Sequence, residues 1–183
     1  MVGSMQSIFS LFWNVCLLRT GPEHMPTVGF FVGVVLVANI VISTLVALSA
    51  PAEPTFLQAL SIPVVAAAVL AGSTLLILRM KNLGHRFTAT ITALLGADII
   101  ITALSWPLLL IPDPAPAGPV SGFGWMLIVA QLALVFWWVT IAGFIFSRAL
   151  AVPMPQGVAV AVFVILASLM ITASVVPLSA GQA

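Results

Sequence analysis

The chain has very little charge: five Lys or Arg and four Asp or Glu among 183 residues, which makes it 5% charged. Soluble globular domains carry about 25% charged residues, so this scarcity excludes a water-soluble fold. The net charge of +1 also excludes nucleic-acid binding, which requires Lys and Arg clustered on one face. The single cysteine, Cys16, excludes an intrachain disulfide. The chain is instead rich in apolar residues, since 62% of its residues are hydrophobic.

Catalytic patterns are absent from the sequence as well. Cys16, His24 and His85 would lie near one membrane surface, but no recognisable spacing joins them to an acidic residue that would orient a histidine. Haem ligation would require histidines inside the apolar segments, and both histidines lie outside them. We therefore predict a protein that is not an enzyme and that holds no metal and no cofactor.

Five apolar segments are each long enough to cross a bilayer, which takes about 20 helical residues for a hydrocarbon core of about 30 Å. They run from Val28 to Leu48, Phe56 to Leu78, Phe87 to Leu110, Gly122 to Ser147 and Gly157 to Leu178. The sequence therefore predicts an all-α polytopic membrane protein, with residues 21–183 forming one domain of five transmembrane helices.

Residues 1–20 are predicted to form a separate N-terminal helix. Its apolar residues Ile8, Leu11, Phe12 and Val15 recur at helical spacing, opposite a polar side. The helical pattern itself runs from Ser4 to Leu18, about 15 residues and too few to cross the membrane, and Gly21-Pro22 ends it. We expect an interfacial amphipathic helix, either bound to lipid or packed on the protein's own cytoplasmic face.

The five basic residues all fall in breaks that would share one side of the membrane. They are Arg19 before the first segment, Arg79, Lys81 and Arg86 between the second and third, and Arg148 between the fourth and fifth. The other two breaks carry only Glu53 and Asp113. Because cytoplasmic loops retain Lys and Arg, we predict a cytoplasmic N-terminus, an external C-terminus and basic side chains that face lipid headgroups. The compact chain suggests a bacterial cytoplasmic (inner) membrane.

Four polar residues are predicted to form a layer near the middle of the bilayer. Counting 1.5 Å per residue from the segment boundaries places Asn39, Asp98, Gln131 and Ser168 at similar depths. Asp98 has no cation at its depth, and apolar surroundings favour a neutral carboxyl group that donates a hydrogen bond to Asn39 or Gln131. Three interpretations stay open for Asp98: hydrogen bonding between helices, transport of a proton or cation, and contact with a bound ligand.

Two further features indicate packing. Gly29 and Gly33 form a Gly-x-x-x-Gly pattern, which lets two helices approach closely, either within the chain or against a partner. Trp137 and Trp138 lie about 15 Å from Arg148 along a helix, too deep for the aromatic belt. We expect these tryptophans to contact neighbouring helices or lipid, with a pigment or quinone as the alternative.

Gly21-Pro22 stands ahead of five segments with short breaks, a cytoplasmic N-terminus and an external C-terminus. This arrangement resembles the Yip1-like small polytopic membrane proteins. The resemblance implies a non-enzymatic membrane organiser that acts through partners. We accordingly predict a scaffold or accessory subunit of a membrane protein complex, which contacts lipid and partner subunits. The alternatives are a small ion- or proton-coupled transporter that uses Asp98, and a pigment- or quinone-contacting subunit of an energy-converting complex.

Overall fold

The computed structural model describes residues 10–25, 28–49, 54–111 and 122–175, and this part of the chain contains helices and no strands. The five long helices are α2 (Gly29–Leu48), α3 (Phe56–Met80), α4 (Phe87–Leu109), α5 (Gly122–Leu150) and α6 (Met154–Val175). Each is long and apolar enough to cross a membrane. The predicted all-α fold with five membrane-spanning segments is therefore confirmed.

Local sequence chemistry sets the ends of these helices. Thr55 and Gln58 form a capping box at the start of α3, because the Thr55 hydroxyl accepts from the Gln58 amide and the Gln58 side chain accepts from the Thr55 amide. The last helix begins at Met154, three residues before the predicted start at Gly157. Pro155 is compatible with the first turn, where a missing N–H leaves no helical bond unmade.

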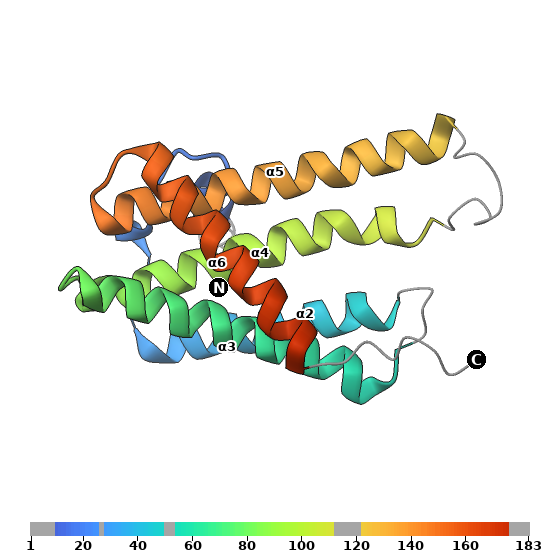
Figure 1. The fold of residues 1–183 in the computed structure, drawn as a ribbon, viewed down its shortest axis with the longest axis horizontal. Helices are drawn as coiled ribbons and strands as arrows, with labels where there is room; N and C mark the ends of the chain where they lie inside the picture. The colour runs from blue at the N-terminus through green and yellow to red at the C-terminus, as the bar shows by residue number, and fades with distance from the viewer. Residues whose placement is uncertain (1–9, 26–27, 50–53, 112–121, 176–183) are drawn as a thin grey trace.

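Successive long helices run antiparallel, and α4 lies at the centre of the bundle (Figure 1). It contacts α2, α3 and α5, and 56% of its apolar span is buried, against 17–22% in the other four helices. Residues 89–97 are all buried, and several are Ala, Gly or Thr, which allow neighbouring helices to approach on every side. The helix that carries Asp98 is therefore also the helix that the others surround.

The N-terminal segment packs inside this arrangement. Residues 10–16 are helical, and the side chains of Val15 and Cys16 are fully buried. The Phe12 ring stacks on Phe31 of α2, with ring centroids 6.2 Å apart. It also covers Gly96 of α4, where any Cβ atom would overlap the ring. Of the two expected placements, these contacts favour packing on the protein's own helices.

The basic residues lie at one end of the bundle, the end with the start of α4 and the turn between α5 and α6 (Figure 1). All five side chains are exposed, namely Arg19, Arg79, Lys81, Arg86 and Arg148. The Arg86 guanidinium donates to the carbonyl oxygens of Ala149 at 3.1 Å and Arg148 at 3.4 Å. A cation there complements the negative end of the α5 dipole. A cavity of about 340 Å³ beside it is lined by Arg86, Arg148 and Glu23.

Candidate ligand-binding pocket between the helices

A hydrogen bond joins the two polar residues that lie deepest in α2 and α4. The Asn39 amide nitrogen donates to Asp98 Oδ2 at 2.8 Å and to the Leu95 carbonyl oxygen at 3.4 Å. Asn39 is almost fully buried, with 4% of its surface exposed. The two residues thus form a bond as predicted, but in the direction opposite to the predicted one, because the Asn39 amide donates and the Asp98 carboxyl group accepts. The bond ties α2 to the central helix.

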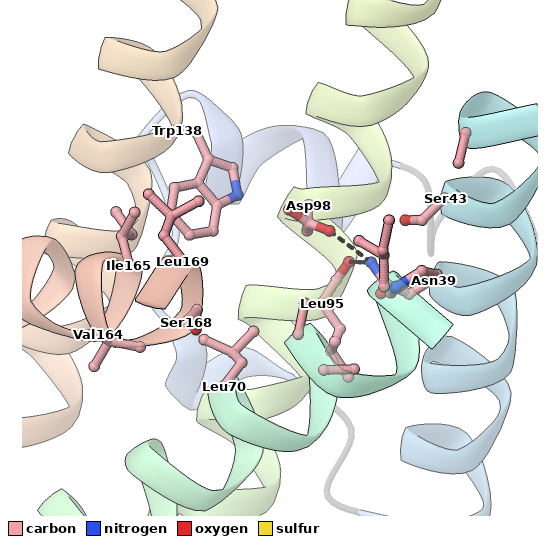
Figure 2. Close-up of a pocket in the computed structure, with 15 residues that line it drawn as sticks. Asn39, Ser43, Leu70, Leu95, Asp98, Trp138, Val164, Ile165, Ser168 and Leu169 are labelled. Carbon is pink, nitrogen blue, oxygen red and sulfur yellow. Dashed lines mark hydrogen bonds between the residues drawn. The ribbon is translucent and has the colours of Figure 1, made fainter. Parts of the chain in front are cut away.

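The same two residues line a cavity of about 300 Å³ (Figure 2). Every long helix contributes to its wall: α2 through Asn39 and Ser43, α3 around Pro63, α4 through Asp98, α5 through Trp138 and α6 around Ser168. Ten of the fifteen lining residues are aliphatic or proline. Small-molecule sites are typically concave, mostly apolar and furnished with a few placed polar groups, which is the character of this cavity.

Trp138 and Ser168 stand on the side of the cavity opposite Asn39. The indole nitrogen of Trp138 points toward the Asp98 carboxyl group (Figure 2). Ser168 lines the cavity from α6, next to Leu169, which has 62% of its surface exposed. The exposure of Leu169 shows that the cavity is not sealed from the outer surface of the bundle. Asp98 is therefore approached by N–H donors from both α2 and α5.

Gln131 does not join this group. It lies seven residues before Trp138 on α5, so it points in nearly the same direction but two turns nearer the other end. Its side-chain oxygen is buried without a hydrogen-bond partner among the described residues. Of the four residues predicted to form a polar layer, the structure brings Asn39, Asp98 and Ser168 to one cavity and leaves Gln131 outside it.

Trp137 holds the N-terminal segment and takes no part in the cavity. Its indole nitrogen donates to the Cys16 carbonyl oxygen at 3.0 Å, and Trp13 packs edge-on against it with centroids 6.5 Å apart. Packing against the chain's own residues is one of the alternatives expected for this tryptophan. Burial raises the pKa of the Cys16 thiol to about 11, so the thiol is neutral at physiological pH.

The two glycines predicted to pack do not meet another helix. A Cβ atom at Gly29 or Gly33 would find nothing within 4 Å among the described residues. Gly33 instead lines an apolar groove on the outer face of α2 with Phe30, Val34, Val37, Ala38 and Val41. Packing within the chain is thus not observed at these positions, and packing against a partner stays a prediction.

Close helix packing occurs at two other glycines, Gly143 of α5 and Gly157 of α6. A Cβ atom at Gly143 would lie 2.9 Å from the Val158 Cα atom, and one at Gly157 would lie 2.7 Å from the Ser147 Cβ atom. The sequence contained the signal, because Gly143 and Ser147 are four residues apart, as are Gly157 and Ala161. Small residues at this spacing favour close contact as much as Gly-x-x-x-Gly does.

Sequence reasoning also missed Ser43 and Pro63 in the cavity wall. Ser43 lies one helical turn after Asn39 and therefore on the same face of α2, which the spacing alone indicates. Nothing in the sequence places Pro63 of α3 and Asp98 of α4 at one cavity, because this depends on how the two helices are rotated.

No protein-family model, curated protein or solved structure matches this chain. The resemblance to Yip1-like proteins stays a prediction.

Proposed function

We propose that the protein is a small ion- or proton-coupled membrane transporter in which Asp98 holds the transported cation or proton. One observation carries this proposal: a carboxyl group near the middle of a membrane helix faces a cavity lined by all five long helices. Carboxyl groups at this depth are rare and typically mark ion pathways. A site in contact with every helix would be reshaped by any movement between them.

The cavity favours a role for Asp98 in transport over a purely structural role. Hydrogen bonds that only join helices are best placed where side chains fill the surrounding space, because empty volume forfeits packing contacts. Here the pair of Asn39 and Asp98 borders about 300 Å³ that no side chain fills. The arrangement is one in which a further group can reach the carboxylate.

The coupling of cation binding to proton release follows from the free-energy cost of an isolated charge inside the membrane. An ionised carboxylate in the hydrocarbon region costs several kcal/mol unless a cation or proton accompanies it. The other residues that line this cavity carry no charge, so Asp98 has no fixed counter-ion there. A proton and a cation would therefore bind Asp98 in competition, and the release of one would accompany the binding of the other.

The test is proton flux into liposomes that contain the purified protein and a pH-sensitive dye. We expect a gradient of Na⁺, K⁺ or benzylguanidinium to change the internal pH beyond the change in protein-free liposomes. Asp98→Asn keeps the size of the side chain but cannot exchange a proton, so it should abolish the response. Circular dichroism and gel filtration of the variant report whether it is folded.

The absence of flux in the wild-type protein with all three cations would contradict this proposal. That outcome would favour the second candidate, an accessory subunit of a membrane complex. The outward-facing groove on α2 around Gly33 supports this candidate, because its large side chains Phe30, Val34, Val37 and Val41 are exposed. Partner subunits would then co-purify in mild detergent, and Gly33→Leu should release them.

We also propose that the basic end of the bundle faces the cytoplasm, in a bacterial inner membrane. The support is the clustering of all five exposed basic side chains at that end. Alkaline phosphatase fused after Ala183 should be active in the periplasm, whereas a fusion after Lys81 should be inactive. Active enzyme after Lys81 together with inactive enzyme after Ala183 would reverse the orientation.

A further inference from the structure

Building on the proposed transport role, we infer that the cavity at Asp98 binds an amphipathic organic cation whose charged group carries N–H donors, as guanidinium and ammonium groups do. The carboxyl group of Asp98 would accept from the cation, and the aliphatic wall would hold its apolar body.

The hydrogen-bonding groups of the cavity select a ligand that donates. Both N–H groups of the Asn39 amide are engaged within the protein, one by Asp98 and one by the Leu95 carbonyl oxygen. The Trp138 indole N–H is also directed at Asp98 (Figure 2). Because these N–H groups are already used within the protein, the groups that remain for a ligand are mainly acceptors. They are the carboxyl oxygens of Asp98 and the amide oxygen of Asn39, together with the hydroxyl groups of Ser43 and Ser168.

This balance disfavours the other ligand classes. A quinone carbonyl or an anion needs donors, and only the two serine hydroxyl groups remain to supply them. A bare inorganic cation would neutralise the carboxylate, but it would make no apolar contact with the surrounding aliphatic side chains. A cation with an apolar body satisfies both parts of the cavity.

The rest of the wall supplies the apolar contacts. Trp138 presents the apolar surface of its indole beside the carboxyl group. Leu70, Val164 and Ile165 line the side contributed by α3 and α6. Leu169, at the exposed border of the cavity, adjoins the outer surface of the bundle. The volume of about 300 Å³ limits the ligand to a small molecule.

The experiment compares two probes of nearly the same shape. Benzylguanidinium stays charged at neutral pH, whereas benzylurea replaces its charged nitrogen with a carbonyl oxygen. Equilibrium dialysis against the protein in lipid nanodiscs, corrected with empty nanodiscs, should give benzylguanidinium an affinity roughly tenfold or more above benzylurea, as expected for a hydrogen bond to a charged group. Benzyltrimethylammonium, a cation without N–H groups, should bind more weakly than benzylguanidinium.

Three variants locate the binding. Asp98→Asn should remove the preference for benzylguanidinium over benzylurea. Ser168→Leu leaves the bond between Asn39 and Asp98 in place and fills the cavity from α6, so it should reduce binding of both probes. Thr140→Ala is the control, because Thr140 is exposed on α5 and its hydroxyl donates to the Phe136 carbonyl oxygen of its own helix. This control should bind as the wild-type protein does.

Equal affinity for the two probes, or a preference that survives Asp98→Asn, would overturn the inference. So would proton flux driven by Na⁺ or K⁺ in a protein that does not bind benzylguanidinium, a result that leaves coupled transport standing. Binding of benzylguanidinium that depends on Asp98 but drives no proton flux would support the inference and contradict the transport proposal.

Discussion

A leucine at Gly157 is expected to separate α5 from α6 and to lower the free energy of unfolding by about 3 kcal/mol or more. The added side chain would overlap the Gly143 carbonyl oxygen and approach the backbone nitrogen of Ser147 to 2.7 Å. Backbone atoms in a helix cannot move aside as the end of a flexible side chain can. The expected effect is therefore at or beyond the upper end of the range for overpacked sites.

Thermal unfolding in mild detergent, followed by circular dichroism, measures this change. Gly72→Leu provides a matched control, because Gly72 lies on the exposed side of α3 and a Cβ atom there meets nothing within 4 Å. Its unfolding temperature should stay close to that of the wild-type protein. If the two leucine variants unfolded at the same temperature, the close approach of α5 and α6 at Gly157 would be refuted.

Cys16 is expected to react with a maleimide about 100-fold more slowly than an exposed cysteine near neutral pH. Its thiol pKa rises through burial from 9.0 to about 11, and a rise of two units leaves about 100-fold less of the reactive thiolate. Stopped labelling reactions analysed by mass spectrometry give the rate. The reference is a Lys81→Cys protein in which Cys16 is replaced with serine.

Loosening the N-terminal segment should remove this protection. Trp137→Phe deletes the donor to the Cys16 carbonyl oxygen, and Phe12→Ala deletes the ring that covers Gly96, so each should speed labelling. Trp125→Phe changes an exposed tryptophan of α5 and should leave the rate unchanged. Rapid labelling of Cys16 in the wild-type protein would show that the segment does not pack as described.

The raised pKa of Cys16 also gives the packing of the segment a pH dependence. Because the folded pKa lies above the ordinary value of 9.0, the neutral thiol contributes its full stabilisation below about pH 9. The contribution is lost as the pH rises from 9 through about 11, where the unfolded chain releases its proton first. The labelling measurement is therefore best made near neutral pH.

The fold could be predicted because hydropathy alone determines which segments are long enough to cross a membrane. The pairing of Asn39 with Asp98 was also within reach, since depth is fixed by counting residues along a helix. The position of α5 along its own axis relative to the other helices was not, and it places Gln131 two turns from Trp138 and outside the cavity. Rotation about the helix axis was also out of reach: small residues show where helices can approach, while the rotation of each helix selects Gly143 and Gly157 and leaves Gly29 and Gly33 facing outward.

The burial of the N-terminal segment also determines the order in which its contacts can form during synthesis. The bond from Trp137 to Cys16 joins residues 121 positions apart, so the helix at residues 10–16 cannot make this contact until α5 has been synthesised. At synthesis rates of 5 to 20 residues per second, the delay between these two residues is roughly 6 to 24 s. During that interval Phe12 can already meet α2 and α4, because both precede α5 along the chain. The arrival of α5 is thus the event that completes the enclosure of Val15 and Cys16.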